Sequence, residues 1–164
     1  MKKSGFFIPL IVLSLVILLL SGVILLGSCS SAYEYTTNGQ RIYFASTSSS
    51  GQSITYSGSI RMMHTIACAN CHGPDGKGGR VNMMMWSFDV PDITWNKLIR
   101  EEAHEEQENG EQHEEHPPYN EETLKSAITR GINPAGEPLD EAMPRWKMST
   151  QDLNDLVNFI KTLK

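Results

Sequence analysis

The spacing of apolar and polar residues divides the chain into segments of different character. Residues 6–26 form a run of 21 residues without a charge, which is long enough to span a lipid bilayer. Residues 29–57 are rich in Ser, Thr, Gly and Gln, which predicts a flexible tether around a strand-like run at 41–44. We therefore expect the folded domain to occupy residues 58–164.

The clearest helix is predicted at the C-terminal end of this domain. Apolar residues recur at i, i+3 and i+4 from Leu153 to Leu163, which is the pattern of a helix with one buried face. Ser149 or Thr150 can cap its first turn, and Asp152 is placed to favour the positive end of the helix dipole.

Two further helices are predicted with less regular patterns. One runs from Glu121 to about Thr129 and ends at Gly131, a residue type that suits the C-cap. The other is a short helix over residues 59–67, which places a few apolar residues on one side. The domain is thus expected to be all-α, with long loops.

The chemistry of the chain is concentrated in Cys68-Ala69-Asn70-Cys71-His72. C-x-x-C-H is the attachment signature of a c-type haem, in which the two thiols form thioethers with the vinyl groups. His72 is then the proximal iron ligand. A zinc site would need a second ligand pair at suitable spacing, and a redox dithiol would be expected in a strand–helix frame. Neither accompanies the motif in this sequence.

The number of cysteines and the net charge exclude further classes of protein. Only one cysteine, Cys29, lies outside the motif, so the chain holds no disulfide framework. Beyond residue 28 the chain carries 12 basic and 19 acidic residues, a net charge of −7. An acidic balance argues against nucleic acid and leaves a basic redox partner open.

The N-terminus predicts export and attachment to a membrane. Lys2 and Lys3 precede the charge-free run, which ends in Leu26-Gly27-Ser28-Cys29 and resembles a bacterial lipobox. Two interpretations remain open. Residues 1–28 are either a cleaved signal peptide, with Cys29 carrying lipid, or an uncleaved membrane anchor. Both place the domain on the periplasmic side of a bacterial membrane.

Several elements in order resemble a mono-haem class I c-type cytochrome. They are Cys68–Gly73, the glycines at 76, 78 and 79, Pro91–Thr94, Met143-Pro144-Arg145-Trp146 and the C-terminal helix. Members of that family often carry a Gly-x-x-aliphatic-aromatic run just before the haem motif. Gly39–Tyr43 resembles this run, but more than twenty residues separate it from Cys68.

The resemblance implies a small fold with its N- and C-terminal helices packed around one covalent haem c. It also implies that the sulfur of Met143 is the second axial ligand, with Met148 as the alternative. Pro91 is a candidate acceptor for the ring N–H of His72, and Arg145 is a candidate partner of a haem propionate. Metal binding by the Met83-Met84-Met85 run is a less favoured idea.

An acidic insertion at 101–118 interrupts the domain. It holds eight Glu and three His before Pro117 and Pro118, which predicts a solvated, disordered segment. Weak metal binding through His113 and His116, or docking to a basic partner, are the alternatives.

Two functional classes follow from these features. The first is a non-enzymatic carrier that passes electrons between redox proteins while attached to the membrane, with both axial sites filled. The second is a haem-based sensor of small ligands or a peroxidase-like enzyme, which needs a displaceable sixth ligand.

Overall fold

The computed structural model describes residues 34–52, 54–58, 66–83, 86–100 and 116–164. These residues contain five helices and four short strands, joined by loops. The chain divides into two units, Met1–Glu34 and Tyr35–Lys164, and all of these elements belong to the second. Along the chain they are α2 (Asn38–Ala45), β1 (Thr55–Ser57), α3 (Cys68–His72), β2 (Gly79–Met83), β3 (Trp86–Val90), α4 (Trp95–Leu98), α5 (Glu121–Arg130), β4 (Arg145–Lys147) and α6 (Thr150–Ile160).

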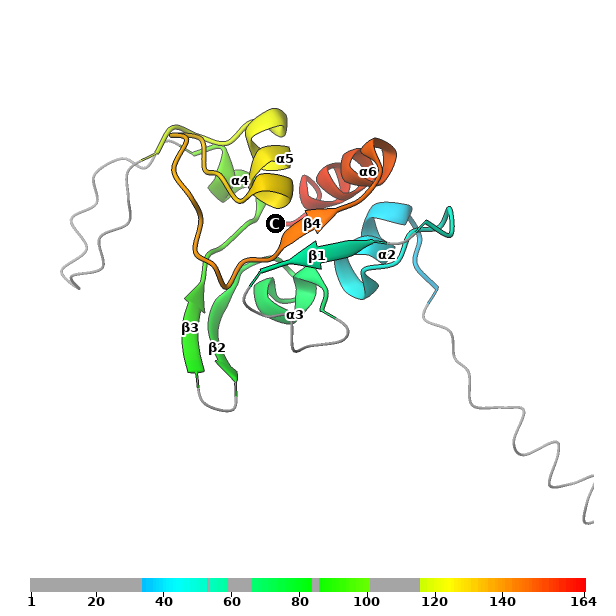
Figure 1. Ribbon diagram of the computed structural model, residues 1–164, viewed down its shortest axis with the longest axis horizontal. Coiled ribbons are helices and arrows are strands. Elements are labelled where there is room, and N and C mark those ends of the chain that lie inside the picture. Colours follow the sequence, from blue (N-terminus) through cyan, green and yellow to red (C-terminus); the bar gives the residue numbers. More distant parts are fainter. Residues whose placement is uncertain (1–33, 53, 59–65, 84–85, 101–115) are drawn as a thin grey trace, which may run out of the picture. The chain divides into compact units, whose positions relative to one another are not determined.

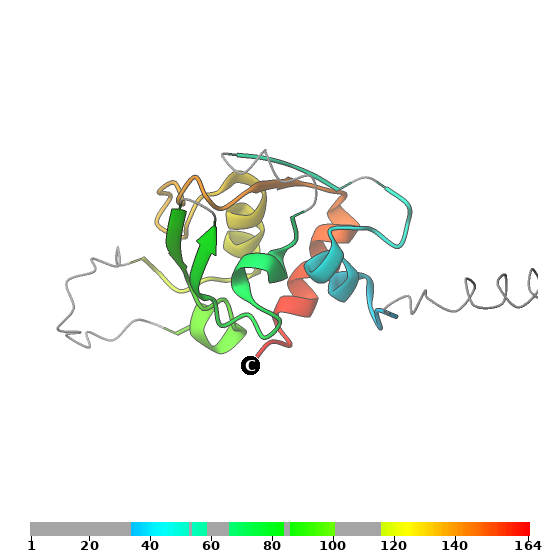
Figure 2. The same cartoon turned by 90° about the horizontal axis from the view of Figure 1, so that it is seen from below.

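The core of the domain forms where α2 crosses α6, and the two helices lie side by side in both views (Figures 1 and 2). Ile42 and Tyr43 of α2 are almost fully buried there, as are Leu156 and Val157 of α6. At Gly39 the helices approach so closely that an added Cβ would lie 2.0 Å from the carbonyl oxygen of Asp155. Only glycine allows this crossing.

Helix α2 corrects the prediction of a flexible tether over residues 29–57 with a strand-like run at 41–44. The Thr37 side chain accepts a hydrogen bond from the amide of Gln40, and Ser46 ends the helix with a left-handed φ of 52°. The aromatic and β-branched residues at 42–44 do favour strands, but burial against α6 determines the helix. The folded domain therefore begins well before residue 58.

The two other long helices agree with the predictions. Ser149 caps α6 by accepting a hydrogen bond from the amide of Asp152, and the apolar stripe of this helix faces the core. Helix α5 ends at Gly131, which has the left-handed φ of 65° expected of a C-cap glycine. The predicted helix over 59–67 lies mostly outside the described residues, and Ala67 has an extended backbone.

Asp152 connects the two crossing helices through polar contacts. Its carboxylate, only 2% exposed, accepts hydrogen bonds from the hydroxyls of Ser48 (2.6 Å) and Ser149 (2.7 Å) and from the amide of Asn38 (2.9 Å). Burial works against ionisation, but these hydrogen bonds outweigh it and hold the pKa of Asp152 below its usual value.

Two pairs of antiparallel strands add to the predicted all-α architecture. In the first pair, Tyr56 of β1 lies opposite Trp146 of β4 and Ser57 lies opposite Arg145. In the second, β2 and β3 form a hairpin with Gly79 opposite Val90. The helical core of the prediction is present, but neither pair of strands was predicted.

The membrane predictions concern a different part of the chain. Among the described residues, no helix is both long enough and apolar enough to cross a bilayer. The charge-free run at 6–26 and Cys29 lie outside the described residues.

Candidate haem-binding site

The five residues of the C-x-x-C-H motif form helix α3. Its start is fixed by Asn70, whose side-chain oxygen accepts a hydrogen bond of 2.7 Å from the amide of Ala67. Cys68 and Cys71 are three residues apart, so both sulfurs lie on one face of the helical turn. Both cysteines are partly exposed, whereas His72 is buried. This arrangement presents the two thiols together and holds the imidazole beside them.

His72 is oriented by a backbone carbonyl. Its Nδ1 lies 3.2 Å from the carbonyl oxygen of Pro91, which can only accept, so Nδ1 carries the proton. The lone pair of Nε2 is then available to a metal. Burial lowers the pKa of His72 despite the opposing effect of the Pro91 hydrogen bond, which favours the neutral ring that an iron ligand requires. The predicted pairing of His72 with Pro91 is present in the structure.

The glycine-rich loop after His72 brings this carbonyl into place. Gly78 has a φ of 66°, and its amide donates to the carbonyl of His72 at 2.9 Å. An added Cβ at Gly78 would lie 2.1 Å from the carbonyl oxygen of Val90 and 2.5 Å from that of Pro91. The loop and the segment at 90–91 therefore touch backbone to backbone, which explains the need for glycine at this position.

Tyr43, which was not among the predicted site residues, supports the same loop. Its hydroxyl donates a 2.7 Å hydrogen bond to the carbonyl of Gly73, and its side chain is fully buried. Burial, with smaller effects of Cys68 and Asp75, raises the pKa of Tyr43, so its hydroxyl remains a donor. The sequence does contain a signal for Tyr43, the Gly39–Tyr43 run that resembles the one found before the haem motif in the family. Its distance of more than twenty residues from Cys68 hid the contact with the haem-motif loop.

The surroundings of the two thiols disfavour the thiolate form. Burial is the main reason that the pKa of Cys68 rises to about 12, and it also raises the pKa of Cys71. A redox-active C-x-x-C motif requires the opposite shift, because the thiolate is its nucleophile. Within the described ranges, no group of three or more His, Cys, Asp or Glu side chains could hold a zinc ion. Both alternatives to haem attachment thus lack support.

Met143 lies in a loop over residues 131–144, which we call the Met143 loop. The methionine is half-buried, its amide donates to the carbonyl of Asp140 at 3.1 Å, and the buried Pro144 follows it. Strand β4 then pairs the chain with β1, just before the segment that leads to the haem motif. Met148, the alternative ligand, packs against the hydrophobic core.

The other candidate aromatic and polar residues have contacts of their own. Trp146 is buried in the core against Tyr56, with ring centroids 5.2 Å apart. The guanidinium of Arg145 binds backbone carbonyls of the Met143 loop. Met84, Met85, His104 and His113 lie outside the described residues, so the ideas of metal binding in those segments stay predictions.

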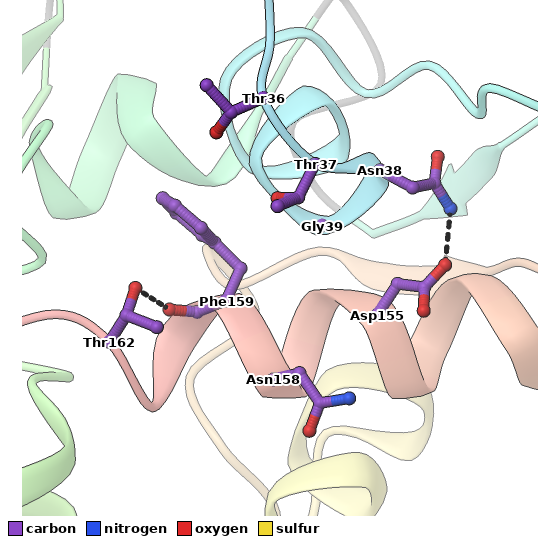
Figure 3. Close-up of a pocket in the computed structure, with 8 residues that line it drawn as sticks. All are labelled: Thr36, Thr37, Asn38, Gly39, Asp155, Asn158, Phe159 and Thr162. Carbon is purple, nitrogen blue, oxygen red and sulfur yellow. Dashed lines mark hydrogen bonds between the residues drawn. The ribbon is translucent and has the colours of Figure 1, made fainter.

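A pocket of about 430 Å³ lies elsewhere, at the crossing of α2 and α6 (Figure 3). Most of its lining residues are of polar types, but apolar atoms form the larger part of its surface. Two of the lining residues are joined by a 2.8 Å hydrogen bond from Asn38 to Asp155. None of the haem-motif residues lines it, so this pocket is not the haem site.

Comparison with known proteins agrees with the geometry. The family model for cytochrome c matches residues 37–164. A search of curated proteins found no match, and neither did a search of solved structures. The match covers more than three quarters of the chain, and the chain therefore belongs to the cytochrome c family. It begins at Thr37, the residue that caps α2.

Family membership defines the cofactor and the general activity. The protein binds haem c covalently, and Cys68, Cys71 and His72 form the attachment site. The partly exposed thiols and the oriented imidazole fit this group. Haem-based electron transfer is the activity of the family, whose members are generally carriers rather than enzymes.

Proposed function

We propose that the protein carries single electrons on one haem, with His72 and Met143 as the two axial ligands of the iron. The bound haem supplies a one-electron Fe(II)/Fe(III) couple. The observation that carries the proposal is the hydrogen bond from His72 to Pro91, because it fixes the tautomer and the direction of the ring. The residues around the site thereby hold the proximal ligand still between the two oxidation states.

The choice of Met143 rests on the differing surroundings of two methionines. Met148 packs on the core, where its removal would leave a cavity rather than an open coordination site. Met143 is the last residue of a turn that its own amide closes by a hydrogen bond to Asp140, and the rigid Pro144 follows it. A thioether in the sixth position favours Fe(II), raises the reduction potential and excludes other ligands, as a carrier requires.

Visible absorption of the haem-loaded protein tests this proposal with a matched pair of variants. Met143→Ala is expected to remove the weak far-red band of sulfur bound to ferric iron and to lower the reduction potential. Met148→Ala is expected to keep both and to lose about 1 kcal/mol of stability, because this methionine is only partly buried against the core. A wild-type spectrum without the band would contradict the ligand assignment.

The rate at which the reduced protein binds carbon monoxide distinguishes an electron carrier from the second functional class. A closed sixth site should make the reduced protein bind carbon monoxide slowly at neutral pH. Ready binding by the wild-type protein would instead favour a sensor of small ligands or a peroxidase-like enzyme.

We further propose that the domain works on the periplasmic side of a bacterial membrane, attached through residues 1–28 or through lipid on Cys29, and exchanges electrons with other redox proteins. The charge-free run at 6–26 and the lipobox-like Leu26–Cys29 support this location. Mass spectrometry of the mature protein distinguishes the two forms of attachment. A lipidated N-terminal Cys29 indicates cleavage, and an intact N-terminus indicates a membrane anchor. Recovery of the wild-type protein in the soluble fraction would contradict both.

A further inference from the structure

The register of the short sheet determines where Arg145 points. Trp146 of β4 is turned into the core against Tyr56. Because neighbouring residues of a strand face opposite sides, Arg145 is turned the other way, toward the Met143 loop. The burial of Trp146 therefore fixes the direction of the arginine beside it.

The guanidinium of Arg145 binds three carbonyl groups of this loop. Nη2 donates to the carbonyl of Leu139 at 2.7 Å, and Nη1 donates to the carbonyl of Asp140 at 3.0 Å. Nη1 also donates to the carbonyl of Met143 itself. Hydrogen bonds from a charged donor are about twice as strong as those between neutral groups. The planar fork of arginine can make all three contacts at once, which the single ammonium of lysine cannot do in the same geometry.

The side chain of Arg145 packs against Gly131, at the start of the Met143 loop. An added Cβ there would lie 1.9 Å from Nε of Arg145, so the guanidinium side chain rests directly on the glycine. The carbonyl of Gly131 accepts a 2.8 Å hydrogen bond from the amide of Leu139, which closes the first part of the loop. Asn133 is buried and bonds to Glu137 at 2.9 Å within that part. The loop is thus closed on itself and held at its end by one side chain.

We propose that Arg145 is the positioning residue for Met143, holding the backbone of the Met143 loop so that the thioether stays on the iron. The inference rests on the proposed His72/Met143 ligation. A ligand supplied by a loop is kept in place only as firmly as its backbone is fixed. Two of the three carbonyls bound by Arg145, those of Asp140 and Met143, are the two ends of the turn that closes at Met143, and the third, that of Leu139, directly precedes it. This assignment differs from the sequence-based expectation that Arg145 binds a haem propionate.

The test compares Arg145→Ala and Arg145→Lys with Arg130→Ala in the haem-loaded protein. Arg130 is the matched control, since it is an exposed arginine beside Gly131 whose guanidinium binds the Ser126 hydroxyl of its own helix. Arg145→Ala is expected to speed carbon monoxide binding to the reduced protein by about tenfold or more, because charged hydrogen bonds that hold the loop are lost. The far-red band should weaken, Arg145→Lys should fall in between, and Arg130→Ala should match the wild type.

Amide hydrogen exchange gives a readout that does not depend on the iron. Arg145→Ala should speed exchange in the Met143 loop while α2 and α6 keep their protection. The inference would be overturned if this variant left the far-red band, the rate of carbon monoxide binding and the exchange of the loop amides all unchanged. It would also be overturned if only the reduction potential changed, because that result indicates a contact with a haem propionate. If Arg145→Ala does not fold, the same outcomes are judged on Arg145→Lys. A wild-type protein without the band refutes the proposed ligation itself, so the two failures are distinguishable.

Discussion

The segments that hold His72 and Met143, the two proposed iron ligands, are stabilised by different physical means. On the side of His72, the loop after the motif is backed by Tyr43 of α2, which is itself buried against α6. On the side of Met143, the loop is held by hydrogen bonds from Arg145 to backbone carbonyls. The segment around His72 depends on the hydrophobic core of the domain, whereas the Met143 loop depends on polar contacts, those within its own backbone and those from Arg145.

This difference predicts which property each kind of variant changes. Changes on the His72 side act on the free energy of unfolding, because the crossing of α2 and α6 is the core of the domain. If Met143 is the proposed sixth ligand, changes in the Met143 loop should alter the coordination of the iron and leave the core intact. If Met143 is the sixth ligand, as proposed, the protein should keep its covalently attached cofactor when this methionine is replaced.

The largest effect on stability is expected from Gly39→Ala. The new Cβ would meet the backbone of Asp155 at 2.0 Å, so the helices must separate, at a cost of about 3 kcal/mol for overpacking. Chemical denaturation measures the loss. The control is Gly136→Ala, where φ is 89° and an added Cβ meets nothing within 4 Å, so only the smaller cost of backbone strain applies. Equal losses in the two variants would contradict close packing at Gly39.

The next effect is expected from Asp152→Ala, which removes the polar link between the helices. Loss of a hydrogen-bonded buried carboxylate should cost about 2 kcal/mol at neutral pH. The pKa of Asp152 is lower in the folded protein, so its contribution is present above the unfolded value near 3.8 and is lost as the pH falls below that value. The variant should therefore approach wild-type stability in acid. A difference that is independent of pH would contradict this role.

The smallest effect is expected from Tyr43→Phe. The ring and its packing remain, and one hydrogen bond to the carbonyl of Gly73 is lost, at a cost of about 1 kcal/mol. The amide of Gly76 still reaches the same carbonyl at 3.4 Å, which limits the loss. Thermal unfolding measures the effect, and the far-red band is expected to stay unchanged. A lost band would contradict the separation of the two sides.

Features encoded over a few neighbouring residues could be predicted from the sequence. The C-x-x-C-H motif, the capped stripe of α6 and the end of α5 at Gly131 each lie within one segment, and the structure contains all of them.

Features that depend on contacts distant in the sequence were missed or incomplete. Helix α2 has only eight residues, and Ile42 and Tyr43 are residue types that favour strands. The helix forms because these residues pack against α6, a contact that is distant in the sequence. The contact of Arg145 with the Met143 loop depends on the pairing of β4 with β1, which no local pattern reveals. The assignment of Met143 came from resemblance to the family and from its place in a proline-rich loop just before Pro144, and it stays a prediction.

Proton NMR of the reduced, haem-loaded protein tests the central claim most directly, with methionine methyl groups labelled. The methyl group of an axial methionine lies over the porphyrin, and the ring current shifts its resonance far from those of other methionines. We predict one such resonance in the wild-type protein, lost in Met143→Leu and kept in Met148→Leu. Absence of a shifted methyl, or its loss only in Met148→Leu, would contradict ligation by Met143.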